Sequence, residues 1–379
     1  MVERKLPSLQ DMPPVSGKYV LVRASLNVPV AEGIVSNEFR IARALPTINK
    51  LRAAGARVIV AAHIGRESEE TLRPVFEVLQ GSLPITFSEK IVGREVLALR
   101  DQLKDGEVLL LENLRRDPGE KINDKNLAAD LAALADYYVN DAFAASHRAH
   151  ASLVGVPALL PSFFGLNFIH EYEELKRVME PVAPALFVLG GAKFDTKLPL
   201  VEEYLETYDH VIIGGALAND FYKGLGYEVG TSLVSDIDLS DSPLLKHKKI
   251  ILPEEVVVDG PEGRRVSQAD AVASNEAILD AGPGFIDTVK ELVLEAKTIL
   301  WNGPLGNFEA GYGEQTTAFG RLVASAPGHS LLGGGDTIAA IEALGCQEKY
   351  GFLSTAGGAM LTFLETKTLP AIDAIIDKS

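Results

Sequence analysis

The stretch NDAFAASHRAHAS, residues 140–152, places His147, Arg148 and His150 within four positions of one another. Their neighbours are small residues, which cannot bury these three side chains. The chain as a whole is acidic, with 52 aspartate and glutamate residues, 36 lysine and arginine residues and a formal net charge of −16. Arginine presents a planar fork of donors that suits carboxylate and phosphate oxygens, so a cationic cluster in an acidic protein indicates a small anionic ligand.

Residues of the same kinds follow the predicted strands in the first half of the chain. Short β-branched runs alternate there with amphipathic stretches, a pattern typical of βαβ units and parallel sheets. The predicted strands cover residues 19–23, 56–63, 83–88, 107–113 and 137–141. Ligands of open parallel sheets bind beyond the carboxyl ends of the strands. At those ends the sequence has arginine, histidine and asparagine, within residues 23–27, 63–66 and 113–116 and near Arg148.

In the second half of the chain, glycines take the place of these polar residues. The predicted strands cover residues 185–191, 210–215, 249–253, 298–303, 330–335 and 351–355, and the motifs GGAK, GGA, NGPLG, GGGD and STAGG stand at strand ends. Glycine lets the backbone approach a ligand closely and lets amides at a helix N-terminus point at phosphates. One glycine pair alone is more often a tight turn, and one arginine alone a solvated charge. Their recurrence at equivalent positions favours an anion site in the first half and a nucleotide site in the second.

The length of 379 residues favours two domains over one. Residues 40–55 have the period of an amphipathic helix, and Gly55 is a suitable C-terminal cap. A charged, helix-favouring stretch at 170–181 separates the two series of strands. Pro181 and Pro184 disfavour helix before them, so the domain boundary is expected within residues 170–184. The predicted fold class is α/β with two domains built on parallel sheets.

Composition and absent motifs exclude several classes of protein. The negative charge disfavours nucleic acid or an anionic membrane as partner. The sequence has no P-loop, no dinucleotide-binding GxGxxG, no protein-kinase loops, and no CxxC, HExxH or GxSxG. The single cysteine, Cys346, fits a reducing compartment. No apolar run reaches about 18 residues and the first residues lack a signal-peptide core, so a cytoplasmic protein is expected.

The motifs taken together resemble phosphoglycerate kinases along nearly the whole chain. The matching stretches occur in the family's order: LVRASLNVPV, NEFRIARALPTI, AAHIGR, LLLENLR, YVNDAFAASHRAHAS, VLGGAKFDTK, VIIGGALA, LWNGPLGNFE, LLGGGDT and STAGGA. The resemblance implies two doubly wound domains, each a parallel sheet flanked by helices, with a cleft between them. It implies that residues 1–172, completed by 363–379, bind phosphoglycerate and that residues 173–362 bind nucleotide.

The resemblance also implies an activity and a set of site residues. The activity is reversible transfer of the acyl phosphate of 1,3-bisphosphoglycerate to ADP in glycolysis, with Mg²⁺, by direct in-line transfer after domain closure. The implied catalytic residues are Lys193 and Arg40. The implied substrate-binding residues are Ser25, Asn27, Arg40, His63, Arg66, Arg115 and Arg148. The implied nucleotide-binding residues are Gly191, Ala192, Lys197, Gly215, Asn302, Pro304, Glu309, Gly334, Gly335, Asp336 and Thr337, with Asp336 also the metal ligand.

Some positions depart from the family's pattern. Ser25 stands where the family has aspartate, and Thr196 replaces an aspartate, with Asp195 one place earlier; the other departures are Glu67, Arg116, Asp117 and Ala216. These changes affect the expected turnover more than the expected fold. Two alternatives therefore stay open: a weakened paralogue that acts as a ligand-binding sensor, and a related phosphotransferase with another acceptor. We expect a monomer whose partners are small molecules.

Overall fold

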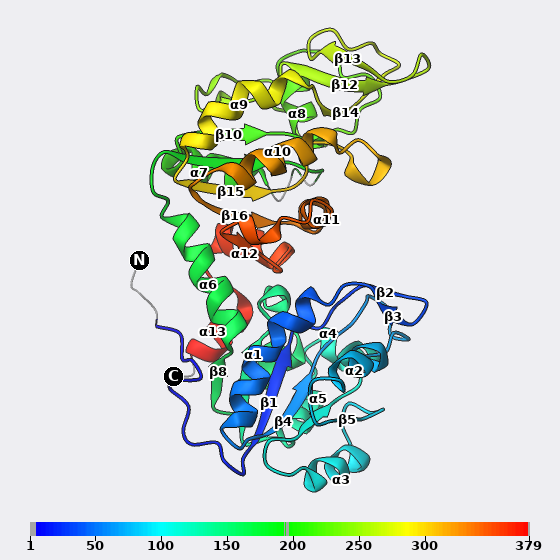
Figure 1. Ribbon diagram of the computed structural model, residues 1–379, viewed down its shortest axis with the longest axis vertical. Helices are drawn as coiled ribbons and strands as arrows, with labels where there is room; N and C mark the ends of the chain where they lie inside the picture. The colour runs from blue at the N-terminus through cyan, green and yellow to red at the C-terminus, as the bar shows by residue number, and fades with distance from the viewer. Residues whose placement is uncertain (1–4, 193, 195–196, 378–379) are drawn as a thin grey trace. The chain divides into compact units, whose positions relative to one another are not determined.

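The computed structural model describes residues 5–192, 194 and 197–377, and the chain divides into two units (Figure 1). Unit 1 comprises Met1–Glu173 with Thr366–Ser379, and unit 2 comprises Glu174–Glu365. Each unit contains one six-stranded parallel sheet, which confirms the α/β prediction. In the described part of the chain, no helix is long and apolar enough to span a membrane.

The sheet of unit 1 has the strand order β5-β6-β4-β1-β7-β8, and all its strand pairs are parallel. Its strands are β1 (Tyr19–Ala24), β4 (Arg57–Ala61), β5 (Ile85–Phe87), β6 (Val108–Leu110), β7 (Tyr137–Asp141) and β8 (Ser162–Phe164). The five strands predicted in this half are confirmed. Strands β1, β4, β6 and β7 are almost entirely buried between the layers, whereas the short edge strand β5 is only partly buried. The short strand β8 was not predicted, since Pro161 and Gly165 on either side of it resemble a loop.

The helices of unit 1 are α1 (Phe39–Ala53), α2 (Arg73–Leu79), α3 (Arg94–Gln102), α4 (Pro118–Lys121), α5 (Lys125–Ala132) and α13 (Pro370–Ile376), with a hairpin of β2 (Val30–Ala31) and β3 (Ile34–Val35). Helix α1 buries Ile41, Ala44, Ile48 and Leu51 at helical spacing, and Gly55 follows its end with φ +79°, so the predicted cap is confirmed. Helix α6 (Leu166–Met179) runs across the division between the units.

The end of the chain belongs to unit 1. Helix α13, red in Figure 1, bonds back to the loop after β7, where Ala371 N donates to the Ser146 carbonyl at 3.2 Å. Ala371 packs with Ala142, Ala145 and Leu153 in a small apolar cluster. The last helix therefore stabilises the loop that carries His147 and Arg148.

The parallel sheet of unit 2 has the strand order β11-β10-β9-β15-β16-β17. Its strands are β9 (Ala185–Leu189), β10 (His210–Ile213), β11 (Ile250–Ile251), β15 (Thr298–Asn302), β16 (His329–Gly333) and β17 (Phe352–Leu353), and all six were predicted. The helices are α7 (Leu198–Thr207), α8 (Ala216–Gly224), α9 (Gly284–Glu295), α10 (Glu314–Ser325), α11 (Gly335–Glu342) and α12 (Gly358–Thr366). A second, antiparallel sheet of β12 (Glu255–Asp259), β13 (Arg265–Gln268) and β14 (Ala277–Ala281) was not predicted, because it lies outside the βαβ alternation.

Candidate active site

Both parallel sheets reverse their strand order once, and ligands of open α/β sheets bind at such a point. In unit 1 the order reverses between β1 and β7, whose carboxyl ends lead to Ser25 and to the loop with Arg148. In unit 2 it reverses between β9 and β15, whose ends lead to Gly190 and Gly303. The topology thus brings the polar strand ends together in one unit and the glycine strand ends together in the other.

A buried arginine lies at the centre of the site in unit 1. Arg23 is 1% exposed and donates to three acceptors: the Ala24 carbonyl at 2.7 Å, Ser152 Oγ at 3.0 Å and His63 Nδ1 at 2.8 Å. Ser152 Oγ in turn donates to Glu120 Oε1 at 2.6 Å. The sequence placed Arg23 at the end of a predicted strand but assigned it no role, and it did not indicate Ser152 or Glu120 as site residues, because neither belongs to a recognisable spacing.

The side chains around His63 carry an excess of positive charge. Burial holds the pKa of His63 well below its ordinary value, and the charges of Arg23, Arg115, Arg148 and His150 lower it further. Burial also lowers the pKa of Arg115, with Arg148 and Arg23 adding to the effect. Cations that disfavour one another's charged forms are stabilised by an anion, so this cluster is suited to a phosphate or carboxylate ligand.

The two histidines after β7 differ in their surroundings. Burial lowers the pKa of His147 to about 4, and the charges of Arg148 and His150 contribute to the same shift. The Nδ1 atom of His147 has no hydrogen-bond partner among the described residues. His150 Nδ1 lies 3.7 Å from Glu120 Oε1. His150 therefore faces the buried carboxylate.

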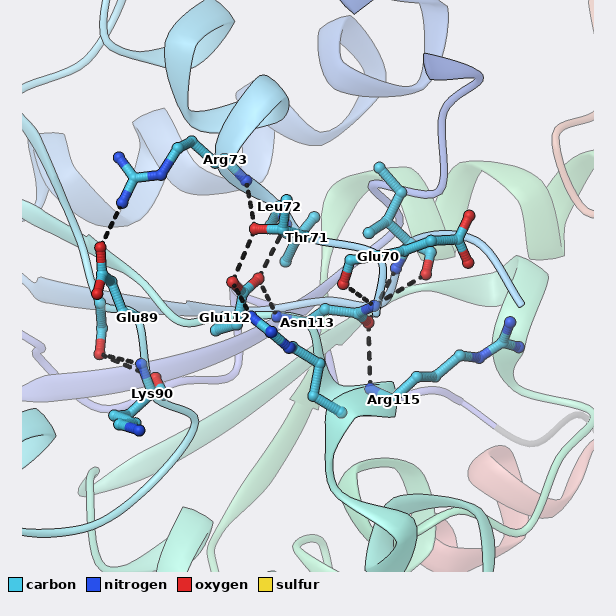
Figure 2. Close-up of polar contacts among 12 residues, drawn as sticks. Glu70, Thr71, Leu72, Arg73, Glu89, Lys90, Glu112, Asn113 and Arg115 are labelled. Atoms are coloured by element: carbon cyan, nitrogen blue, oxygen red, sulfur yellow. Dashed lines mark hydrogen bonds and ion pairs between the residues drawn. The ribbon is translucent and has the colours of Figure 1, made fainter. Parts of the chain in front are cut away.

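Asn113 joins two of the strand ends, as Figure 2 shows. Its Oδ1 accepts from the backbone N–H groups of Ile64 and Arg115, and its Nδ2 donates to the carbonyls of Ile64 and Glu70 at 3.0 and 2.8 Å. The neighbouring Glu112 accepts from Leu72 N at 2.9 Å and from Thr71 Oγ1 at 2.7 Å. These contacts tie the segment after His63 to the turn that presents Arg115.

The other predicted substrate residues lie in different settings. Asn27 Oδ1 accepts from Gly65 N at 2.8 Å, so Asn27 meets the segment after His63, and Ser25 is buried. Arg40 lies at the start of α1, where burial lowers its pKa and the Glu171 carboxylate raises it. Arg66 is exposed. The hydrogen bonds and charge interactions described so far bring Asn27, His63, Arg115 and Arg148 together. Neither Arg40 nor Arg66 takes part in these particular interactions.

A cavity of about 240 Å³ lies at the glycine strand ends of unit 2. Of the predicted nucleotide residues, Gly191, Ala192, Gly215, Pro304, Glu309 and Asp336 line it. Gly215 has φ +60°, and a Cβ there would lie 2.5 Å from Gly191 N. Only glycine permits this approach of two loops, which explains why backbone forms the part of the cavity wall at Gly191 and Gly215.

The remaining predicted nucleotide residues surround these loops without lining the cavity. Lys197 is buried, and its Nζ donates to the Gly190 carbonyl. Thr337 Oγ1 accepts from Gly303 N at 3.0 Å, and Asn302 is buried at the end of β15. Gly334, with φ +98°, precedes α11, whose first residues are Gly335 and Asp336. Lys193, with Asp195 and Thr196, lies outside the described residues.

The cavity also contains polar groups that the sequence did not indicate. Asn219 Nδ2 donates to the Leu233 carbonyl at 3.0 Å, while its buried Oδ1 has no partner among the described residues. Asp280 lines the cavity at the end of β14, and burial raises its pKa to about 7. Asn219 follows the GGA motif within α8 but is not part of it, and Asp280 lies in a strand that carries no such motif.

The carboxylates available suit a magnesium–nucleotide complex better than a metal held by protein alone. Among the described residues, no group of three or more histidine, cysteine, aspartate or glutamate side chains could hold a metal ion. Mg²⁺ is commonly bound by one or two carboxylates together with substrate phosphates. Asp336, exposed in the first turn of α11 and lining the cavity, fits that role.

The fold and the two sites define a class, a kinase built of two α/β units. The family model described as phosphoglycerate kinase matches residues 9–367. Phosphoglycerate kinases of Methylorubrum populi and Thermus thermophilus are 40% and 41% identical to the chain, covering 98% and 97% of it and 99% of each relative. The solved phosphoglycerate kinase of Coxiella burnetii matches with a TM-score of 0.83 and 37% identity, over 98% of this chain and 99% of that structure. The solved phosphoglycerate kinase of Pyrococcus horikoshii matches with a TM-score of 0.85 and 31% identity, over 98% of each chain. The chain belongs to the phosphoglycerate kinase family.

Proposed function

We propose that this protein catalyses the reversible transfer of the acyl phosphate of 1,3-bisphosphoglycerate to ADP, giving 3-phosphoglycerate and ATP in glycolysis. One observation carries the proposal beyond family membership. A cationic cluster lies at the carboxyl edge of one parallel sheet, and a cavity whose wall includes Gly191 and Gly215 lies at the carboxyl edge of the other. The first suits a phosphorylated carboxylate and the second a nucleotide.

The reaction needs no nucleophilic side chain. The acyl phosphate is an activated donor and the β-phosphate of ADP is a competent nucleophile, so catalysis consists of positioning and of stabilising charge on the moving phosphoryl group. His63, Arg66, Arg115, Arg148, Asn27 and Ser25 are proposed to bind phosphoglycerate. Arg40 and Lys193 are proposed to stabilise the phosphoryl group in transit.

The nucleotide is proposed to bind in the cavity of unit 2. Gly191, Ala192, Gly215 and Pro304 would contact the base and ribose, and Glu309 the ribose hydroxyls. Lys197, Asn302, Thr337 and the amides of Gly334 and Gly335 would lie near the phosphates. Asp336 would hold Mg²⁺, which neutralises phosphate charge when bound.

Because the ligands are assigned to different units, transfer requires a closing motion that brings them together and excludes water. We further propose that the protein is a cytoplasmic monomer. Its partners are proposed to be small molecules, since its acidic charge disfavours binding to nucleic acid and to anionic membranes.

A coupled assay tests the function directly. Turnover is measured with ATP, Mg²⁺ and 3-phosphoglycerate, and in parallel with other phosphorylated carboxylates. We expect turnover with 3-phosphoglycerate. Turnover with another phosphorylated carboxylate but not with 3-phosphoglycerate would instead identify a related phosphotransferase. Ser25, which stands where the family has aspartate, is the reason to test this alternative. Binding of both ligands without any turnover would identify a sensor.

A further inference from the structure

The contact between Arg23 and His63 determines where the imidazole carries its proton. Arg23 Nη2 lies 2.8 Å from His63 Nδ1. A guanidinium has only donors and stays protonated, so His63 Nδ1 must accept this bond. An imidazole that accepts at Nδ1 is neutral and holds its proton on Nε2.

The guanidinium itself is held on three sides. Its other bonds go to the Ala24 carbonyl and to Ser152 Oγ, at 2.7 and 3.0 Å. Ser152 is fixed in turn by Glu120, which accepts from its Oγ at 2.6 Å and from its backbone N at 2.9 Å. Arg23 and Glu120 are 1% and 0% exposed, so neither has a hydrated alternative conformation nearby. The orientation of Arg23 is therefore built into the core of unit 1.

We propose that Arg23, oriented by Ser152 and Glu120, is a positioning residue that holds His63 as the neutral Nε2–H tautomer and so directs one N–H donor at the phosphoglycerate. The choice of ligand rests on the proposed function. Among the described residues, no other hydrogen bond to the His63 ring is found, which leaves Nε2–H available for a ligand oxygen. Arg23 acts through His63 and needs no contact with the ligand.

The charges around His63 strengthen this arrangement. The groups that face it are Arg23 from β1, Arg115 from the turn after β6, and Arg148 and His150 from the loop after β7, and all four lower its pKa. Glu120 of α4 lies behind Arg23 and offsets its charge. His63 thus stays a neutral donor through the physiological pH range, while Arg115 and Arg148 supply the positive charge.

The wild-type protein provides the first test. Nitrogen-15 NMR of the full chain with labelled histidine distinguishes the two neutral tautomers and the imidazolium, and loss of one signal in His63→Gln assigns the ring. We expect the Nε2–H pattern for His63 throughout pH 6 to 8. An Nδ1–H tautomer, or a charged ring at pH 7, would overturn the proposal.

A matched pair of serine variants tests the support of Arg23. Ser152→Ala removes the acceptor for Arg23 Nε, so the guanidinium loses its fixed orientation and the His63 signals should shift towards a mixture of tautomers. The Kd for 3-phosphoglycerate should rise about three- to tenfold, as for loss of one hydrogen bond of ordinary strength. Ser88→Ala is the control, because Ser88 is equally buried in unit 1 and its side-chain hydroxyl bonds only to the backbone of Lys90. Unchanged His63 signals in Ser152→Ala would contradict the role of Ser152.

A pH series separates positioning from mere structural support. Arg23→Met removes the donor and a neighbouring positive charge, so the pKa of His63 rises. The ring then becomes a cation as the pH falls, which strengthens anion binding. The phosphate of the ligand itself titrates near pH 6, which changes the Kd of both proteins in the same way. The quantity to compare is therefore the Kd of the variant divided by the Kd of the wild type at each pH. We expect this ratio to fall between pH 8 and 5.5; a constant ratio would show that Arg23 is only structural.

Two measurements keep this inference separate from the proposed function. If Arg23→Met does not fold, the wild-type spectrum and Ser152→Ala still decide the matter. Turnover of the wild type is measured alongside. An active enzyme with the other tautomer overturns only the inference, whereas an inactive protein with the Nε2–H tautomer contradicts only the function.

Discussion

The side-chain carbonyl of Asn113 accepts a hydrogen bond from the backbone N–H of Arg115 at 3.1 Å. The same amide bonds to Ile64 twice and to Glu70 once, so all its hydrogen-bonding capacity is used inside the protein. Asn113 thereby sets the position of Arg115 relative to the segment that begins at His63.

Replacing Asn113 should therefore affect stability and substrate binding together. Asn113→Ala leaves buried backbone groups of Ile64 and Arg115 without partners, which should lower the free energy of unfolding by about 2–4 kcal/mol. The Kd for 3-phosphoglycerate should rise and that for ADP should not. Denaturant unfolding and titration calorimetry measure these effects. Asn126→Ala, at an exposed position of α5, is the control, and equal losses in both variants would contradict the role of Asn113.

Removing Arg148 should weaken one ligand only. A hydrogen bond to a charged group typically contributes about 1.5–3 kcal/mol, so Arg148→Ala should raise the Kd for 3-phosphoglycerate about 10- to 100-fold. The Kd for Mg-ADP should stay within a factor of two, because the cavity of unit 2 contains no residue of this cluster. Arg94→Ala, at an exposed residue of α3, is the control. Equal weakening of both ligands would refute the assignment of one ligand to each unit.

Removing Lys193 should lower kcat far more than it raises either KM. A lysine that meets the phosphoryl group in transit acts mainly in the transition state, and loss of such a charge lowers kcat on the order of a hundredfold. Lys197→Ala should instead raise the KM for ADP. Steady-state kinetics of both variants, with the exposed Lys290→Ala as control, separate the two roles. A raised KM with unchanged kcat in Lys193→Ala would make this residue a ground-state binder.

Restoring an aspartate at Ser25 should tighten substrate binding. A neutral hydrogen bond contributes about 1 kcal/mol and a charged one about 1.5–3 kcal/mol, so the serine loses roughly 1 kcal/mol. Ser25→Asp should therefore lower the KM for 3-phosphoglycerate several-fold. Ser82→Asp, at an exposed position of the same unit, adds the same charge as a control. A higher KM in Ser25→Asp would mean that the surroundings of this buried side chain are suited to serine.

The buried carboxyl of Asp141 should make stability depend on pH. Burial raises its pKa from 3.8 to about 7, although hydrogen bonds from Phe168, Thr47 and Asn167 oppose the rise. Between these values the folded state binds more protons than the unfolded state, so stability falls as the pH rises through this window and stays lower above it. Asp141→Asn removes this dependence.

The measurement compares Asp141→Asn with the wild type by urea unfolding at pH 5 and pH 8. The free energy of unfolding of the variant relative to the wild type should increase by roughly 2–3 kcal/mol between these two pH values. Asp280, whose pKa is also raised to about 7, is present in both proteins and cancels in the difference. Asp130→Asn, exposed on α5, should show no such increase. The same trend in both variants would assign the effect to general charge instead of to Asp141.

The strands and the glycine loops could be predicted from the sequence because their causes are local. Strands such as β1 and β9 are buried on both faces, so their residues form continuous apolar runs. Gly191 and Gly215 have positive φ, a conformation that other residues rarely adopt, so their places at strand ends are visible as glycine pairs. The antiparallel sheet was missed because its strands have no helices between them to complete the βαβ pattern.

The network around His63 was decided by the tertiary structure. Arg23 is separated by 40 residues from His63 and by 129 from Ser152, and neither separation leaves a pattern in the sequence. Whether a charged residue is buried depends on the partners that folding brings to it. Glu120 is fully buried beside His150 and Ser152, which lie some thirty residues further along the chain. The sequence by itself determined which residue types stand at the strand ends. Only the folded chain decided which of them meet, because the parallel sheet aligns strand ends that are distant in the sequence.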